Sequence, residues 1–205
     1  KNLPDNTKPL DVWLEAYTTG TLSTSQQQSI DNLLSYMSSR GIGPDWYDFM
    51  YSPSKVWDMY QRLLIPFYWK GEIVGFTGRV FEESQAVKYY TDVWPGYVFN
   101  MDAQDWTRKF VIVTEGPFDA ISVSGVSILG SEINDTQREL IDNRNRQVIL
   151  VPDRDTPGQK LIDQALEFGW SVAFPEWQKG VVDVADAVSK YGRLFVMQSI
   201  LKSTE

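Results

Sequence analysis

The 205-residue sequence contains no cysteine and no histidine. The absence of cysteine excludes disulfides, thiol nucleophiles and thiolate metal ligands. The absence of histidine excludes imidazole acid–base chemistry and, with cysteine also missing, zinc ribbons. The sequence also lacks a GxxxxGK(S/T) run, which excludes ATP hydrolysis of the P-loop kind. Any metal ion in this chain must therefore be bound through oxygen atoms.

Long hydrophobic runs are missing as well. No stretch approaches the roughly 20 apolar residues of a transmembrane helix, and no secretory signal peptide is visible. We therefore expect a soluble, cytoplasmic protein from a cell or a virus, with no membrane partner. The sequence begins with lysine rather than methionine, as an excised fragment would.

The charge of the chain is acidic overall. It carries 27 Asp and Glu against 19 Lys and Arg, a net charge of −8. This balance argues against a protein whose whole surface binds nucleic acid. A local basic groove is still compatible with it, because acids gathered around a metal ion count toward the total while being neutralised.

Two apolar runs, FVIVTEG (110–116) and QVILVPDRD (147–155), end abruptly in carboxylates. Both are short and rich in Val and Ile, which is typical of parallel strands covered on both faces. A proline follows each run, Pro117 and Pro157, at the point where a helix would begin. The sequence thus predicts carboxylate-bearing turns at the carboxyl ends of two strands, the edge where α/β sheets bind ligands.

Three of these carboxylates, Glu115, Asp153 and Asp155, are expected to share this edge. Asp153 and Asp155 are two residues apart, so in extended chain both side chains point to one side. Three close carboxylates repel one another unless a cation joins them. Mg²⁺ or Mn²⁺ is the expected ion, because it takes oxygen ligands and shares them with water and phosphate. The alternative is that these are ordinary helix caps and solvated turn acids.

Before these runs the sequence changes from a helical to a strand pattern. Apolar residues at helical spacing predict helices over residues 10–17 and 24–40. The run RLLIPFYWKGEIVGFTGRVF (62–81) then predicts two strands joined by a hairpin at Lys70-Gly71. The segments KYYTDVW and YVFN continue the strand pattern. Together these elements predict a small α+β lobe.

The predicted fold class is α/β. Residues 1–105 form the α+β lobe, and residues 106–205 form a mostly parallel sheet flanked by helices. The polar stretch 101–108 at the boundary is a candidate short helix. Further elements expected in the second domain are helices over 135–141 and 157–168, a strand SVAFP, a short helix after Asp183, and a helix over 194–201.

Several segments resemble a known family. TEGPFDAI, SEINDTQRELI and VILVPDRDTPGQKLIDQA resemble the TOPRIM fold of primases, topoisomerases and some nucleases. SYMSSRGIG, and RLLIPFYWKGEIVGFTGRV followed by VKYY, are similar to the segments that precede this fold in DnaG-type primases. The resemblance extends from about residue 33 to residue 191. Pro117 departs from the pattern, because DnaG-type primases usually carry an aromatic residue there.

The resemblance implies a DNA primase catalytic core, a nucleotidyltransferase that makes short primers on single-stranded DNA from nucleoside triphosphates. It implies that Glu115, Asp153 and Asp155 are catalytic and bind Mg²⁺. Asp119 and Asp183 are candidate additional metal ligands. The candidate contacts to the triphosphate or the template backbone are Arg62, Arg79 and Lys88.

The resemblance also bears on partners and leaves alternatives open. Primases of this type read their start site with a zinc-binding module, which this chain cannot build without Cys and His. We therefore expect such a module, or a replicative helicase, outside this chain. One alternative is a TOPRIM nuclease, in which the same ions activate water. The other is a non-catalytic nucleic-acid-binding replication protein that retains the fold.

Overall fold

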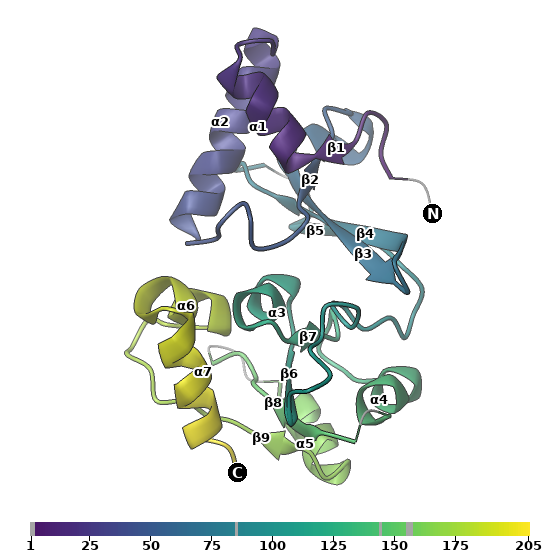
Figure 1. The fold of residues 1–205 in the computed structure, drawn as a ribbon, viewed down its shortest axis with the longest axis vertical. Coiled ribbons are helices and arrows are strands. Elements are labelled where there is room, and N and C mark those ends of the chain that lie inside the picture. Colours follow the sequence, from purple (N-terminus) through teal and green to yellow (C-terminus); the bar gives the residue numbers. More distant parts are fainter. Residues whose placement is uncertain (1–2, 85, 144, 155–157) are drawn as a thin grey trace. The chain divides into compact units, whose positions relative to one another are not determined.

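The computed structural model describes residues 3–84, 86–143, 145–154 and 158–205 (Figure 1). The chain divides into two compact units, Lys1–Trp94 and Pro95–Glu205. Each unit is described by itself below.

The division between the units lies about ten residues before the predicted boundary at 105/106. Phe99 exchanges backbone hydrogen bonds with Ser127, and the Gln104 side chain donates to the carbonyls of Ser124 and Gly125. These contacts attach the intervening segment to the second unit. The segment YVFN, which we had expected in the first lobe, therefore belongs to the second unit.

The first unit is built on an antiparallel sheet with the strand order β1-β2-β3-β4-β5. Its strands are β1 (Lys8–Pro9), β2 (Met50–Tyr51), β3 (Arg62–Trp69), β4 (Glu72–Val80) and β5 (Tyr89–Asp92). The predicted hairpin at Lys70-Gly71 joins β3 to β4, and both turn residues have positive φ, 51° and 81°. Such turns match the right-handed twist of the two strands. The α+β lobe predicted from the sequence is confirmed.

The helices of the first unit are α1 (Leu10–Thr18), α2 (Thr24–Ser39) and the 3-10 helix η1 (Val56–Gln61). Ser23 caps α2, because its side chain accepts a hydrogen bond from the Gln26 backbone N–H while the Gln26 side chain returns the contact. Ile30, Leu33 and Met37 are fully or almost fully buried. Their helical spacing is the pattern from which the helix was predicted.

The second unit contains a parallel sheet with the strand order β7-β6-β8-β9. Its strands are β6 (Phe110–Thr114), β7 (Val126–Ser127), β8 (Gln147–Leu150) and β9 (Ser171–Val172). The predicted pairing of the two carboxylate-ended runs is confirmed: β6 and β8 are parallel neighbours, with Phe110 opposite Gln147 and Val113 opposite Leu150. Val113 and Leu150 are completely buried.

The helices of the second unit are α3 (Pro117–Val123), α4 (Asp135–Asp142), α5 (Gln159–Glu167), α6 (Val184–Tyr191) and α7 (Arg193–Lys202). Pro117 occupies the first position of α3, as predicted, and Asn134 caps α4. Residues 101–108 are not helical. The Asp105 side chain there accepts hydrogen bonds from the backbone and hydroxyl of Thr107, which favours a turn.

Two groups of helices cover the parallel sheet (Figure 1). Helices α3, α6 and α7 pack on one another, and Arg193 at the start of α7 donates to the Ser122 carbonyl of α3. The Gln164 side chain of α5 bonds both backbone groups of Ile133, in the segment that leads into α4. Among the described residues, no helix has the length and apolar character needed to cross a membrane.

Close backbone approach in the second unit yields a first prediction. A Cβ atom on Gly125 would stand 2.6 Å from the Ile112 carbonyl oxygen of β6. Gly125→Ala should therefore lower the free energy of unfolding by about 1–3 kcal/mol, because backbone must shift to make room. Gly130→Ala is the control, since nothing lies within 4 Å of its Cβ position. Urea unfolding followed by tryptophan fluorescence tests this; equal midpoints for the two variants would contradict it.

Candidate metal centre

Glu115 follows the last residue of β6, and buried hydroxyl groups fix its backbone. Ser127 Oγ donates to the Glu115 carbonyl at 2.7 Å. Thr114 Oγ1 lies 3.0 Å from the Gly116 carbonyl oxygen and 3.2 Å from that of Val126. Because Val126 and Ser127 form β7, the neighbouring parallel strand holds the turn at which Glu115 leaves the sheet.

The Glu115 carboxylate lies against the backbone that follows β8. The Asp153 N–H donates to Glu115 Oε2 at 2.9 Å. This contact follows from the strand register, since Val113 is opposite Leu150 and the Val151 N–H donates to the Val113 carbonyl. The Asp153 backbone therefore lies beside the Glu115 carboxylate. A metal ion shared by the two carboxylates stays a prediction.

Asp155, the third predicted carboxylate, lies outside the described residues. Gly158 is the next described residue, and a Cβ atom there would lie 3.7 Å from Glu115 Oε1. Asp153 and Gly158 thus both lie beside the Glu115 carboxylate. A role for Asp155 as a metal ligand stays a prediction.

Asp119 and Asp183 both contribute to the first turn of α6. Asp119 is 7% exposed, and its Oδ1 accepts a hydrogen bond from the Ala185 N–H at 2.8 Å. Asp183 is the N-cap of α6, and its Oδ1 accepts from the Asp186 N–H at 2.8 Å. Carboxylates stabilise a helix at this end because they satisfy its unpaired N–H groups. The structure therefore gives both acids a structural function that the sequence did not predict.

In the described part of the chain, the candidate metal ligands do not form one cluster of acids. Within residues 3–84, 86–143, 145–154 and 158–205, no three acidic side chains form a group that could hold a metal ion. One or two carboxylates are nevertheless enough for Mg²⁺, which completes its shell with water and phosphate oxygens. The oxygen-only chemistry of Glu115 and Asp153 fits Mg²⁺ or Mn²⁺ in this way.

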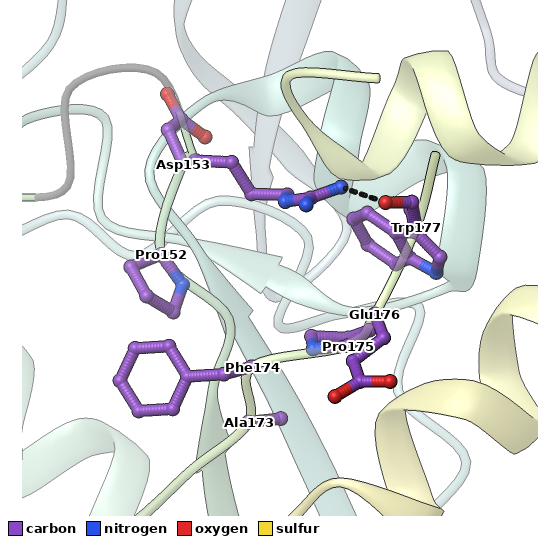
Figure 2. Close-up of a pocket in the computed structure, with 8 residues that line it drawn as sticks. Pro152, Asp153, Ala173, Phe174, Pro175, Glu176 and Trp177 are labelled. Atoms are coloured by element: carbon purple, nitrogen blue, oxygen red, sulfur yellow. Dashed lines mark hydrogen bonds between the residues drawn. The ribbon is translucent and has the colours of Figure 1, made fainter. Parts of the chain in front are cut away.

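Arg154, which the sequence analysis did not select, joins two loops at this edge of the sheet. Its Nη1 lies 3.0 Å from the Trp177 carbonyl oxygen and 3.3 Å from that of Val181, and its backbone N–H donates to the Val182 carbonyl at 2.8 Å. Hydrogen bonds thus connect Arg154, the residue after Asp153, to the loop that leads to Asp183 (Figure 2). The one sequence feature that could have identified Arg154 is its position between Asp153 and Asp155.

Arg62 in the first unit is buried, which the predicted phosphate contact did not anticipate. The residue is 2% exposed. Its Nη1 donates to the carbonyls of Gly78 and Val87 at 3.0 Å each, and its Nε donates to the Trp57 carbonyl at 3.3 Å. Burial lowers the pKa of the Arg62 guanidinium. The side chain therefore organises backbone in this structure rather than offering its charge to a ligand.

Arg79 and Lys88 lie near each other on β4 and beside β5. The Arg79 guanidinium carbon is 5.6 Å from the Tyr36 ring centroid and 5.3 Å from that of Tyr89. Its Nε is buried and has no hydrogen-bond acceptor among the described residues. Lys88 is exposed, and its carbonyl accepts from the N–H of Val80, the residue after Arg79. The structure thus brings together two of the three predicted cations.

One family model and several solved structures are similar to this chain. Residues 112–184, which include Glu115 and Asp153, match the Toprim-like family model. No curated protein sequence matches the chain. This part of the second unit is therefore similar to Toprim-like domains.

Several solved primase structures share the fold. The RNA polymerase domain of Mycobacterium tuberculosis primase DnaG superposes with a TM-score of 0.71 and 16% identity, covering 94% of this chain and 83% of that one. The zinc-binding and RNA polymerase domains of the Aquifex aeolicus primase give 0.69 and 22%, covering 95% and 60%. The primase fragment of the bacteriophage T7 primase-helicase protein gives 0.57 and 17%, covering 80% and 68%.

At sequence identities this low, the superpositions establish a common fold. The chain has the fold of DnaG primase catalytic cores, as the resemblance implied. It spans 60% of the length of the Aquifex aeolicus chain.

The contacts of Arg154 yield a second prediction. Arg154→Ala removes a positive charge near the candidate metal site, which by electrostatics alone would raise cation affinity. We expect the opposite, a fall in Mn²⁺ affinity of about tenfold, because residues that hold metal ligands in place affect affinity on that scale. Arg138→Ala is the control for charge, since Arg138 pairs with Asp142 on α4. Calorimetry measures the affinities, and a tighter or unchanged Arg154→Ala site would contradict the positioning role.

Proposed function

We propose that the chain is the catalytic core of a DNA primase, which joins nucleotides along a single-stranded DNA template. The observation that carries the proposal is the hydrogen bond from the Asp153 N–H to the Glu115 carboxylate at the carboxyl edge of β6 and β8. This edge lies in a Toprim-like domain within the fold of primase catalytic cores. The two units together support primase rather than an isolated Toprim domain, because the fold matched includes the first unit.

The reaction is phosphoryl transfer. A primer 3′-hydroxyl attacks the α-phosphorus of a nucleoside triphosphate, the bond to the β-phosphate breaks and pyrophosphate leaves. Catalysis of this kind depends on positioning and on neutralising phosphate charge. Glu115, Asp153 and Asp155 would hold Mg²⁺, which when bound neutralises the phosphates. Glu115 is suited to this because Ser127 holds its backbone carbonyl and the Asp153 N–H holds its carboxylate.

The cations of the first unit are proposed to bind phosphate. Arg79 stands between two tyrosine rings, so its guanidinium is held in one orientation before a ligand arrives. A pre-oriented guanidinium suits bidentate contact with phosphate oxygens, and an exposed lysine acts as a point charge. We therefore propose that Arg79 and Lys88 contact phosphate groups of the triphosphate or of the template. Arg62 supports them from inside the sheet.

The proposed partners are single-stranded DNA, nucleoside triphosphates and a module outside this chain. Solved relatives of the fold include a primase with a zinc-binding domain and a primase fragment of a primase-helicase protein. The chain itself has no cysteine or histidine for such a zinc site. A zinc-binding module or a helicase elsewhere would supply template recognition.

A second candidate is a non-catalytic nucleic-acid-binding replication protein with the same fold. One observation favours it: backbone N–H groups bind the carboxylates of Glu115, Asp119 and Asp183 without a metal ion. Metal-dependent synthesis separates this candidate from a primase.

A third prediction tests the carboxylates. Glu115→Gln and Asp153→Asn should each abolish templated synthesis, because they remove the charge that binds the metal while keeping the side-chain shape. Asp155→Asn tests the third predicted ligand in the same way. Asp163→Asn is the control, since Asp163 is exposed on α5 and accepts from Gln159.

The measurement is incorporation of labelled nucleotides on single-stranded DNA with Mg²⁺ or Mn²⁺, beside calorimetry of Mn²⁺ binding. Full activity in Asp153→Asn would refute the assigned site. Intact DNA binding without synthesis by the parent chain would favour the non-catalytic candidate.

A fourth prediction concerns phosphate contacts. Arg79→Ala and Lys88→Ala should each weaken binding of single-stranded DNA or nucleotide. The slope of log affinity against log salt should become shallower by about 0.7 for each lost DNA phosphate contact. Arg138→Ala on α4 is the control for net charge. Fluorescence anisotropy across a salt series gives the slopes, and slopes equal to the parent's in both variants would mean that neither cation contacts phosphate.

A further inference from the structure

The polar side chain of Gln137 is buried in the second unit. Gln137 is 5% exposed and occupies the third position of α4. Its Oε1 accepts a hydrogen bond from the Asn134 N–H at 3.2 Å. Its Nε2 donates to the carbonyl oxygens of Ile128 and Tyr97, at 2.9 Å and 3.0 Å. All of these partners are backbone groups, so the side chain fixes the path of the chain around it.

The bond to Ile128 begins a series of hydrogen bonds that ends at Glu115. The Ile128 carbonyl and the Leu129 N–H belong to one planar peptide group, so they turn together. That N–H donates to Ser127 Oγ at 3.0 Å, and Ser127 Oγ donates to the Glu115 carbonyl at 2.7 Å. Hydrogen bonds in such a series polarise and strengthen one another. Gln137 is thereby connected to the residue that carries the candidate metal-binding carboxylate.

The peptide group in the middle of this series belongs to a strained turn. Leu129 has a φ of 56°, in the left-handed region that residues with a Cβ atom disfavour. Strain of this kind persists only where the surrounding structure over-determines the conformation. Here Gln137 holds the carbonyl of the peptide group and Ser127 holds its N–H. Loss of the Gln137 donor would therefore allow the peptide group to turn and to release Ser127.

A second buried glutamine holds the other end of β7. Gln104 is also 5% exposed. Its Nε2 donates to the carbonyls of Ser124 and Gly125, at 3.2 Å each, just before the strand. Gln137 bonds the residue just after the strand. Both side chains hold the same short strand, but the series that reaches Glu115 starts from Gln137.

We propose that Gln137 is a positioning residue for the candidate metal centre, because it fixes Glu115 through the 128–129 peptide group and Ser127. Gln137 acts in this way without touching the metal ion or a substrate. The inference rests on the proposed function, since it concerns the metal ion that Glu115 would bind. It extends the metal centre to α4, a helix that carries none of the proposed ligands.

The test compares Gln137→Met with the matched control Gln104→Met. Methionine keeps the length of glutamine but has no donor, so each variant leaves buried carbonyls unsatisfied and should unfold at a lower urea concentration. Gln137→Met alone should also lower Mn²⁺ affinity, by about tenfold, the scale on which residues that orient a metal ligand act. Calorimetry under conditions where both variants are folded measures the affinities. Gln137→Asn, which keeps the donors on a shorter side chain, replaces Gln137→Met with the same expectation if that variant does not fold.

Hydrogen exchange gives a second measurement, on protein without metal. The Leu129 amide should exchange faster in Gln137→Met, relative to the core amide of Val113, because its bond to Ser127 is weakened. The same ratio should keep the parent value in Gln104→Met. An unchanged ratio in Gln137→Met would contradict the hold on the peptide group.

A double-mutant cycle tests the route to Glu115. Ser127→Ala removes the last donor of the series and should lower Mn²⁺ affinity to a similar extent. The double variant with Gln137→Met should lose less than the two single losses combined, because both changes act on one series of contacts. Fully additive losses would overturn the role of Ser127 as the link.

The outcomes separate the two proposals. If Gln137→Met and Gln104→Met bind Mn²⁺ equally well, the positioning role is refuted, while templated synthesis by the parent leaves the proposed function standing. If the parent neither binds Mn²⁺ nor carries out synthesis, the proposed function fails and this inference fails with it.

Discussion

The hydrogen bond from the Asp153 N–H to the Glu115 carboxylate joins two strand ends that are 38 residues apart in the chain. It requires β6 and β8 to pair in one register, because a slip of one residue would turn every side chain of the strand to the other face. Buried Val113 and Leu150, which lie opposite each other, stabilise that register. The apolar core thus determines the positions of Glu115 and Asp153 at the ends of the two strands.

Backbone amides, rather than a cation alone, accommodate the acids in this structure. Glu115 accepts from the Asp153 N–H, Asp119 from the Ala185 N–H, and Asp183 from the Asp186 N–H. Hydrogen bonds from N–H groups to carboxylates are charge-assisted and strong. Repulsion between crowded carboxylates is therefore a weaker argument for a metal ion than the sequence suggested. The proposed metal ion is supported instead by the oxygen chemistry and the position of Glu115 and Asp153.

The sequence predicted those features that depend on neighbours in the chain. The hairpin at Lys70-Gly71, the helix over residues 135–141 and the strands β6 and β8 follow from turn chemistry and periodicity. Apart from the pairing of β6 with β8, contacts distant in sequence could not be read from it. The bridge between Phe99 and Ser127 moves the unit boundary, and a pocket next to Asp153 forms only where residues 152–154 meet residues 173–177 (Figure 2).

Arg62 and Arg79 show how the same residue type takes different roles on neighbouring strands. A buried guanidinium is costly unless its donors are satisfied, and Arg62 meets that requirement with the carbonyls of Trp57, Gly78 and Val87. Arg79 instead lies between two rings with a donor that no described residue accepts. Because Val87 directly precedes Lys88, Arg62 holds the backbone at the exposed cation. A phosphate site on this unit would therefore depend on Arg62, because Arg62 holds the backbone beside Lys88. The charge of Arg62 itself is buried in the sheet and bonded to backbone carbonyls.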